Sequence, residues 1–400
     1  MPVVTFLGTA NSQLKPAQRV VSFNFEEICL DFVQDESFRK SADKINRLLH
    51  REGDKSLSHT TLKDRTEAFG HRISHEQSDQ AVGILRAYKV NPDTGVPDSG
   101  SALQEEACLP ILSPSYDKRR AKGIIKAYNE GRRESETIKD SDKVRQVERD
   151  QTECVYISVD DIGVKHQKEE RGANTERDKK YVENTVIHVE SQEGQYTLTA
   201  IGMRNAFMLL MAYLLHNRLM ENRRLIFITD GAVVIRDYIR MFFGFRQYTI
   251  ILDWLHLEKK NKELLSMAVR EPKPEKGLIR ATLNRILWAG NTHDAIAFLE
   301  SIDPGKVKNQ KALNEVTDYL RRKEPYIACY ALRKLTGLRV SSNRVEKAND
   351  LVVAGRQKHN GMSWSKYGSG ALAAITAANI NGNIDRYIRH EETKFMPVAA

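Results

Sequence analysis

The stretch LIFITDGAVVI, residues 225–235, constrains the fold of this chain more than any other segment. Its apolar run over 225–228 shows no alternation, which predicts a strand covered on both faces. The strand is predicted to end at Asp230, and a Gly-Ala step then leads into a helix that opens at Val233. A carboxylate in this position lies where open α/β sheets bind ligands, but Asp230 would equally suit the cap of the following helix.

The segments around this strand predict a mixed sheet in the α/β class. VYISVDDIGVKH (155–166) predicts a first strand, the charged residues 166–180 an exposed loop, and the alternating segments 182–190 and 194–202 an antiparallel hairpin. A helix over about 205–218, the Asp230 strand, a helix over 233–243 and a strand over 248–253 follow. The order β-β-β-α-β-α-β predicts an antiparallel start followed by parallel strands joined through helices.

The rest of the chain is predicted to be largely helical. Residues 261–340 carry apolar positions with a period near 3.6, which predicts an all-α insertion, and a helix over 341–354 returns the chain to the sheet. These patterns predict six regions: an N-terminal segment (1–36), a helix-turn-helix region (37–75), a charged connecting region (76–150), an α/β domain (151–260 and 341–380), the all-α insertion (261–340) and a tail (381–400).

Two short helices within 37–75 predict a helix-turn-helix. Ser58 is the expected N-cap of the second helix, which places Leu62, Thr66 and Phe69 on one face. The start of this helix offers side chains that reach phosphates and base edges, namely His59, Thr60, Thr61, Lys63 and Arg65. An ordinary helical hairpin is the alternative. The charged stretch 117–150 predicts an exposed helix and a link between domains.

Composition favours a nucleic-acid partner. The net charge is +9 and the pI about 9.2, which suits a polyanion. The four cysteines have no paired spacing, so neither a zinc site nor a disulfide framework follows from them. The longest apolar run, 207–215, is far too short to span a membrane, and the first residues lack the pattern of a secretory signal. We therefore expect a soluble, cytoplasmic protein.

Three carboxylates stand at the ends of predicted elements. Asp160 ends the first strand, Asp230 ends the fourth, and Glu346 lies in the helix that follows the all-α insertion. If they converge at one sheet edge, they can hold two Mg²⁺ ions and support in-line phosphoryl displacement. For Glu346 there is an alternative, since the segment 343–346 also fits a capping box at a helix start.

At these positions the chain resembles a known family. VDDIGVK, ITDGA, ILDWLHL and the block SSNRVEKANDLVV…GRQKHNGMSWS are similar to DDE transposases of bacterial insertion sequences, of the ISLre and ISKra groups, and distantly to Mutator-like transposases. The resemblance covers about 154–378. It implies an RNase H-like catalytic core with an all-α insertion, upstream DNA binding, and catalytic metal ligands at Asp160, Asp230 and Glu346, holding Mg²⁺ or Mn²⁺.

The first acidic position is ambiguous, because Asp160 and Asp161 are adjacent. Strand alternation puts Asp161 on the face of Val155, Ile157 and Val159, and Asp160 on the opposite, more polar face. A rigid strand position suits a ligand better than a turn, so we expect Asp160 to be the ligand. A bulge near Gly163 would reverse these faces.

Other residues near the site have two interpretations. Asp253 and His256 form an Asp-x-x-His pattern similar to the family's, although Asp253 equally suits a helix start. Several basic or aromatic residues could contact DNA, but a solvated charge or a packed ring is the favoured interpretation of each: Lys259, Lys260, Arg356, Lys358, His359 and Trp364.

The leading hypothesis from the sequence is a DNA transposase that cuts transposon ends and joins them to target DNA. Its partners would be those two DNAs, and it would act in the nucleoid as a homodimer or higher oligomer, because two ends must be held together. The alternatives are an inactive, domesticated DNA-binding regulator and an RNase H-like nuclease without strand transfer.

Overall fold

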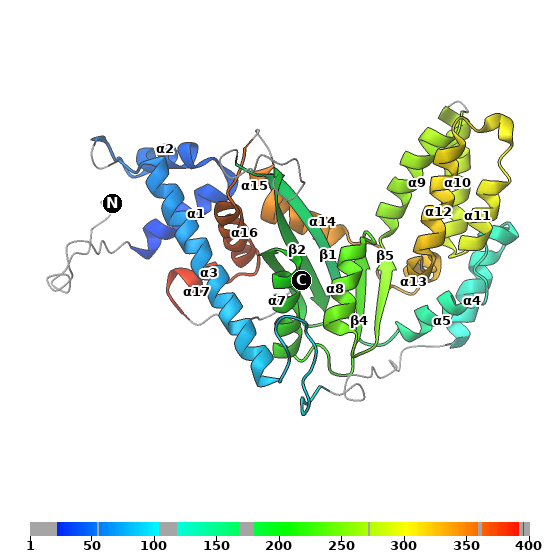
Figure 1. The fold of residues 1–400 in the computed structure, drawn as a ribbon, viewed down its shortest axis with the longest axis horizontal. Helices are drawn as coiled ribbons and strands as arrows, with labels where there is room; N and C mark the ends of the chain where they lie inside the picture. The colour runs from blue at the N-terminus through cyan, green and yellow to red at the C-terminus, as the bar shows by residue number, and fades with distance from the viewer. Residues whose placement is uncertain are drawn as a thin grey trace.

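The computed structural model describes residues 22–53, 56–103, 118–167, 180–270, 273–358, 362–391 and 395. A five-stranded mixed sheet lies at the centre (Figure 1), in the order β3-β2-β1-β4-β5. Its strands are β1 (Cys154–Lys165), β2 (Tyr181–Ser191), β3 (Gly194–Ile201), β4 (Arg224–Thr229) and β5 (Tyr248–Leu252). β2 is antiparallel to both β1 and β3, whereas β4 and β5 run parallel to β1. The predicted mixed sheet is thus confirmed. Most of the predicted 166–180 loop lies outside the described residues.

The register of β1 decides which side chains share a face. Its pairing with β2 runs unbroken from Tyr156↔Glu190 to Lys165↔Tyr181, so the described strand has no bulge at Gly163. Val155, Ile157 and Val159 are buried together in one core cluster. Asp160 therefore lies on the opposite face, as predicted, which it shares with the buried residues Ile162 and Val164 of a second cluster.

The face of the sheet that carries Val155 is covered by two helices and part of a third. These are α7 (Met203–His216), α8 (Val233–Phe243) and the end of α3 (His59–Ala87). α7 buries most of its side chains because it lies between the sheet and α3. In α8, Ile235, Ile239, Phe242 and Phe243 recur at helical spacing and face the core.

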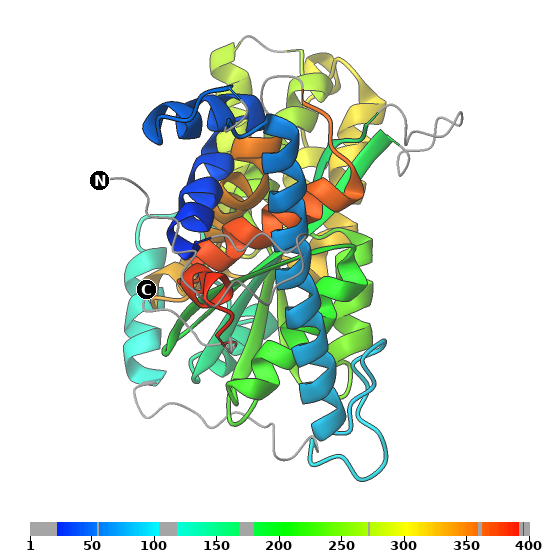
Figure 2. The ribbon, with the colours of Figure 1, turned by 90° about the vertical axis from the view of Figure 1, so that its left-hand side faces the viewer.

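A group of N-terminal and C-terminal helices packs together beside β3. It comprises α1 (Phe23–Asp35), α2 (Phe38–Leu48), α3, α16 (Lys366–Ile380) and α17 (Ile384–Ile388). α3 runs from the top to the bottom of the view in Figure 2 and contacts α16. Gly70 makes this close approach possible, because a Cβ there would lie 2.2 Å from the carbonyl oxygen of Ala371.

The helical insertion packs on the opposite face of the sheet, against Ile226 and Ile228 of β4 and Ile251 of β5. Its main helices are α9 (Trp254–Ala268), α10 (Lys273–Trp288), α11 (Thr292–Glu300), α12 (Gln310–Lys323) and α13 (Tyr330–Leu335), with short 3-10 turns η6 (Pro304–Lys306) and η7 (Glu324–Tyr326). The predicted helical character of 261–340 is confirmed, and the first helix already begins at Trp254. The chain returns through α14 (Asn343–Asn349), the π-helical turn η8 (Asp350–Ala354) and α15 (Gly355–Gln357).

The charged stretch before β1 has an exposed first helix, as predicted, since only Ala121 of that helix is buried, whereas its second helix packs on the insertion. It forms α4 (Lys118–Asn129), η4 (Glu134–Glu136) and α5 (Asp142–Arg149), which lie beside the insertion (Figure 1). Val144 and Val147 of α5 are buried in a cluster with Leu332. Between α5 and β1, the fully buried Asp150 pairs with the fully buried Arg333 at 2.6 Å. Among the described residues, no helix is long and apolar enough to cross a membrane.

Candidate active site

Asp160 and Asp230 lie beside each other, just beyond the point where the parallel pairing of β1 with β4 ends. Asp160 does not end its strand, as the sequence predicted, because β1 continues to Lys165 through its pairing with β2. The last paired residues of β1 and β4 are Ser158 and Ile228, and each aspartate follows two positions later. The equal offset puts both carboxylates on the same face. The negative charge of Asp230 also contributes to raising the pKa of Asp160, as expected for neighbouring carboxylates.

Asp160 is held in place by neutral hydrogen-bond donors. Its Oδ1 accepts a 2.9 Å hydrogen bond from the backbone N–H of Asp161, and its Oδ2 accepts one of 2.6 Å from Nδ2 of Asn349. Burial, followed by the charge of Asp230, raises the pKa of Asp160 to about 6, while His256 acts in the opposite direction. This electrostatic environment favours a cation beside the two carboxylates.

Asp230 both faces the site and shapes the turn into α8. Its Oδ1 accepts a 2.7 Å hydrogen bond from the N–H of Ala232. Ala232, and not Asp230, is the N-cap of α8, and no side chain caps this helix, so the interpretation of Asp230 as the helix cap is wrong. Gly231 has φ +79°, and a Cβ there would lie 2.9 Å from Cδ1 of Leu252 and 3.2 Å from Nζ of Lys323. Glycine is therefore required at this turn.

Lys323 reaches this turn from the end of α12, in the helical insertion. Its ammonium group donates to the carbonyl oxygen of Gly231. Burial lowers the pKa of Lys323, and the neighbouring Arg236 adds to this effect, whereas Asp230 raises it. Arg236 itself donates to the hydroxyl of Tyr326 at 2.8 Å. The insertion thus places positive charge next to Asp230. The contact joins positions 92 residues apart, so no local sequence signal identified Lys323.

Glu346 does not join the aspartates in this structure. It lies exposed in the first turn of α14, the helix that also carries Asn349. Within the described part of the chain, no three His, Cys, Asp or Glu side chains gather as a metal-binding group. The sequence-predicted ligands are therefore brought together for Asp160 and Asp230 only. The capping-box interpretation also fails, since the N-cap Ser342 makes no side-chain cap bond.

Asn349, which the sequence did not single out, occupies the position over Asp160. Its amide nitrogen donates to Asp160, while its own Oδ1 is buried without a hydrogen-bond partner among the described residues. The chain continues directly from Asn349 into η8. π-helical turns are rare in proteins, and those that occur are often found at functional sites. An amide oxygen beside two carboxylates is a hard donor of the kind that Mg²⁺ accepts.

Asp253 is structural, and it fixes α14 relative to the sheet. It is fully buried, and its Oδ1 caps α9 by accepting from the N–H groups of Leu255 and His256. Its Oδ2 accepts from both the N–H and the hydroxyl of Ser342, the residue before α14. The helix-start interpretation of Asp253 is confirmed, whereas its neighbour His256 is near enough to Asp160 to influence its ionisation.

Asp161 points away from this constellation. Its side chain is exposed, and its Oδ1 accepts a 2.6 Å hydrogen bond from the hydroxyl of Thr185. It lies on the strand face opposite Asp160, the face of Val155, Ile157 and Val159. The geometry thus favours Asp160 over Asp161 as the first acid.

Two of the residues considered for DNA contact are packed inside the protein. Arg356 is 4% exposed, donates to the carbonyl oxygen of Val33, and lies over the rings of Phe38 and Trp364. Trp364 is 6% exposed, and its indole N–H donates to the carbonyl oxygen of Gln357 at 3.1 Å. Neither can contact DNA from these positions. Lys259 and Lys358 are exposed, Lys260 is half-buried, and His359 lies outside the described residues.

The N-terminal helices differ from the helix-turn-helix that the sequence predicted. The N-cap Ser58 is confirmed, since its hydroxyl oxygen accepts from the N–H of Thr61, and Leu62, Thr66 and Phe69 are buried as expected. However, residues 49–58 separate α2 from α3, and α3 continues to Ala87, beyond the expected boundary at 75. The extension packs on α7, so region 37–75 is not a separate module. His59, Thr60 and Thr61 are exposed.

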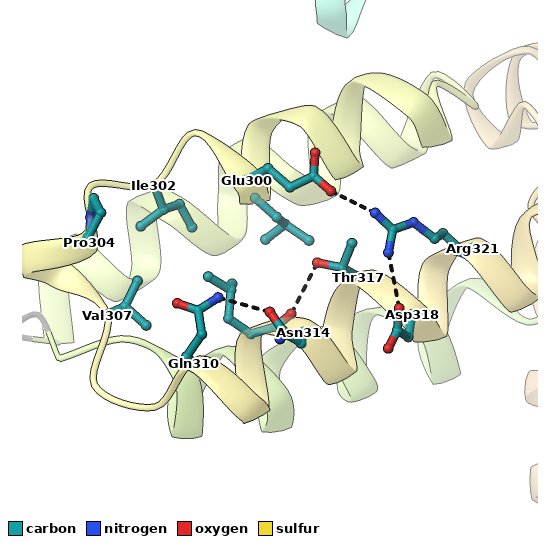
Figure 3. A pocket seen from close by; sticks show the side chains of 11 residues that line it. Glu300, Ile302, Pro304, Val307, Gln310, Asn314, Thr317, Asp318 and Arg321 are labelled. Atoms are coloured by element: carbon teal, nitrogen blue, oxygen red, sulfur yellow. Dashed lines mark hydrogen bonds and ion pairs between the residues drawn. The ribbon is translucent and has the colours of Figure 1, made fainter.

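A cavity in the helical insertion lies away from the carboxylates. It has a volume of about 380 Å³ and lies between α11 and α12 of the insertion (Figure 3). Arg321 crosses one end, paired with Glu300 at 2.7 Å and with Asp318 at 3.1 Å. Neither Asp160 nor Asp230 lines it. Its basic and acidic groups are already paired, so it offers no evident catalytic group.

Comparisons with known proteins leave the family open. No protein-family model matches the chain, and no curated protein matches its sequence. Among solved structures, the Drosophila P element transposase strand transfer complex aligns over 91% of this chain and 81% of its own chain, with 9% identity and a TM-score of 0.24. That score is too low to establish a shared fold, so the functional argument rests on the geometry of the site.

Proposed function

We propose that this protein is a DDE-type DNA transposase with an RNase H-like catalytic core. The observation that carries the proposal is the pair Asp160 and Asp230, which lie beside each other just beyond the parallel pairing of β1 with β4. The strand order, with an antiparallel β1–β3 unit followed by parallel β4 and β5, is compatible with the core that the sequence resemblance implies. The all-α insertion precedes the helix of Glu346, as that resemblance also implies.

The site suits Mg²⁺ or Mn²⁺, because two carboxylates repel each other where burial deprives them of water. Asp160 and Asp230 would hold the metal, and we assign the third ligand position to Glu346, with Asn349 holding Asp160 in orientation. When bound, a pair of such ions activates the attacking oxygen and stabilises the leaving oxygen of a phosphodiester. Glu346 would join the pair by a movement of α14, whose last residue leads into the π-helical turn.

The chain's own groups would position the DNA. Lys323 places its ammonium group beside Asp230, where it would pair with a phosphate oxygen. The overall charge of +9 and the exposed residues at the start of α3 would attract and bind the duplex. A homodimer or higher oligomer would hold two transposon ends for joining to the target, and the protein would act in the nucleoid.

The test uses the chain's own flanking DNA. The wild-type protein is incubated with linear fragments from either side of its coding sequence, Mg²⁺ and a supercoiled plasmid. We expect strand cleavage at an element end and joined products in the plasmid. Asp230→Ala and Asp160→Asn should abolish both reactions and leave DNA binding nearly intact, while Asp161→Asn keeps a measurable part of the activity.

Each alternative function has its own outcome in this assay. Cleavage without joined products, under conditions where pre-cleaved ends also fail to join, would identify a nuclease without strand transfer. Binding of flanking DNA without any metal-dependent cleavage would identify a DNA-bound regulator. Wild-type cleavage by Asp230→Ala would refute the metal site itself.

A further inference from the structure

A second pocket lies beside the candidate active site, on the same face of the sheet. It has a volume of about 230 Å³ and lies between the strands and the connection from α13 to α14. Its floor includes Tyr156 and Ser158 of β1 and His188 and Glu190 of β2. The helical insertion packs on β4 and β5, and α14 packs on β1 and β2. The pocket therefore lies at the boundary between these two packed regions.

The floor of this pocket is polar, in contrast to the other face of the same strands. Tyr156 lies opposite Glu190, and Ser158 lies opposite His188. On the other face, the same two strands carry only aliphatic side chains at the intervening positions, from Val155 to Val159 and at Ile187 and Val189. Burying polar groups costs free energy unless they find partners. The hydroxyl of Tyr156 accepts from the N–H of Arg339 and Glu190 is paired with that arginine, so the buried polar atom of this floor that calls for a partner is on His188.

His188 supplies an unpartnered polar atom in this floor. The residue is 8% exposed, and its Nδ1 lies 3.2 Å from the hydroxyl oxygen of Thr197. Its Nε2 is buried and has no hydrogen-bond partner in the part of the chain that the structure describes. Burial lowers the pKa of His188 to about 4, with Glu190 opposing and Arg344 and Arg339 adding to the effect. The ring is therefore neutral at pH 7.

The rim of the pocket is positively charged. Lys334, Arg339 and Arg344 line it, against the single carboxylate of Glu190. One oxygen of Glu190, Oε1, accepts a hydrogen bond from Arg339 and forms an ion pair with Arg344 at 3.3 Å. Lys334 and Arg344 are exposed enough to turn toward a ligand. An anion with several oxygens, such as a phosphate group, matches this arrangement of donors.

The pocket is close enough to the aspartates to hold the same DNA strand. Ser158 precedes Asp160 by two residues on one strand face, a separation of roughly 7 Å. Arg344 lies two residues before Glu346 on α14. We propose that this pocket binds a backbone phosphate of the DNA strand, next to the phosphodiester that faces Asp160 and Asp230. This inference rests on the proposed function.

Paired variants test the pocket without disturbing the aspartates. Lys334→Gln/Arg344→Gln removes two exposed charges from the rim, and Lys311→Gln/Lys347→Gln removes two exposed charges elsewhere, one of them also on α14. Circular dichroism and thermal unfolding should show both proteins folded like the wild type. Inorganic phosphate binding is measured in EDTA by calorimetry, and duplex DNA binding is measured against salt concentration.

We expect the rim variant to bind inorganic phosphate at least about tenfold more weakly than the wild type and the control. The slope of log affinity for DNA against log salt should fall by about one for each DNA phosphate that the variant no longer neutralises. The control variant removes the same number of positive charges. The change in its slope therefore measures the effect of lowering the net charge of the protein at any surface position. Equal phosphate affinity and equal slope in rim variant and control would overturn the proposal.

The two measurements also distinguish a phosphate of the DNA backbone from a free phosphate compound as the ligand of the pocket. Weaker binding of inorganic phosphate with an unchanged DNA slope would mean that the pocket takes a free phosphate compound, which overturns the assignment to DNA. A failure of the proposed function would look different. In that case Asp160 and Asp230 variants would show no defect because the wild type cleaves nothing, while the phosphate and slope effects of the rim variant would persist.

Discussion

The substitution Asp160→Asn should stabilise the metal-free protein while abolishing its activity. Burial and the charge of Asp230 raise the pKa of Asp160 from 3.8 to about 6, which disfavours the ionised group in the folded state. A shift of about two units corresponds to about 3 kcal/mol at neutral pH. Because part of the carboxylate is solvated, we expect a gain of roughly 1–3 kcal/mol in the free energy of unfolding.

The dependence on pH gives this prediction a definite sign. The folded-state pKa lies above the unfolded one, so the stability contributed by protonated Asp160 is fully present below about 3.8 and is lost as the pH rises through about 6. The advantage of the asparagine variant should therefore be complete at pH 7.5 and should shrink toward zero near pH 4. Asn349 can turn its amide to pair with the new side chain, so the hydrogen bond need not be broken.

Urea unfolding in EDTA, followed by circular dichroism between pH 4.5 and 8, measures this effect. Asp237→Asn, an exposed aspartate on α8, is the matched control and should show no comparable gain. Adding Mg²⁺ should raise the thermal midpoint of the wild type and leave that of Asp160→Asn unchanged. A variant no more stable than the wild type at pH 7.5, or a gain that is independent of pH, would refute the electrostatic reasoning.

Three further substitutions test the surroundings of the site. Lys323→Met should lower DNA cleavage at least about tenfold without changing the thermal midpoint, because the ammonium group that it removes faces the site. As a control, Lys311→Met at the other end of α12 should have no effect in the same assay. Gly231→Ala should cost about 1–3 kcal/mol in urea unfolding, because of its positive φ and its contact with Leu252. Asp253→Ala should cost at least about 3 kcal/mol in the same measurement, because it leaves several buried N–H groups unpaired, whereas Asp303→Ala at an exposed cap should cost about 1 kcal/mol.

The sheet could be predicted because its signals are local. The continuous apolar run of β4 indicates a strand that is buried on both faces, and the alternating patterns of β2 and β3 indicate a hairpin. The order of these elements along the chain limits how the strands can be connected. Once β1 and β4 are parallel neighbours with Ser158 paired to Ile228, Asp160 and Asp230 lie at equal distances along the chain beyond that pair. The face of Asp160 followed from alternation alone, because the strand pairing is continuous.

In the N-terminal region, local sequence signals predict the start of a helix but not its end. Ser58 and the apolar face of α3 marked the start of a helix correctly. Its end could not be placed, because the sequence shows no cap near residue 75 and α3 is stabilised by contacts with α7 and α16 far along the chain. The packed ring favoured for Trp364 is confirmed. The solvated charge favoured for Arg356 is wrong, because contacts with Val33 of α1 and Phe38 of α2, far away in the sequence, bury its guanidinium group.

The third carboxylate illustrates a different limit, set by the rotation of one helix. Glu346 and Asn349 are three residues apart on α14, so their side chains differ by about 60° around the axis and about 4.5 Å along it. The spacing of acids in the sequence cannot distinguish two positions so close together. The orientation is set instead by Asp253, which binds Ser342 at the start of the helix, and by Asp160, which binds Asn349 at its end. A ligand role for Glu346 would therefore require α14 to move relative to these two anchors.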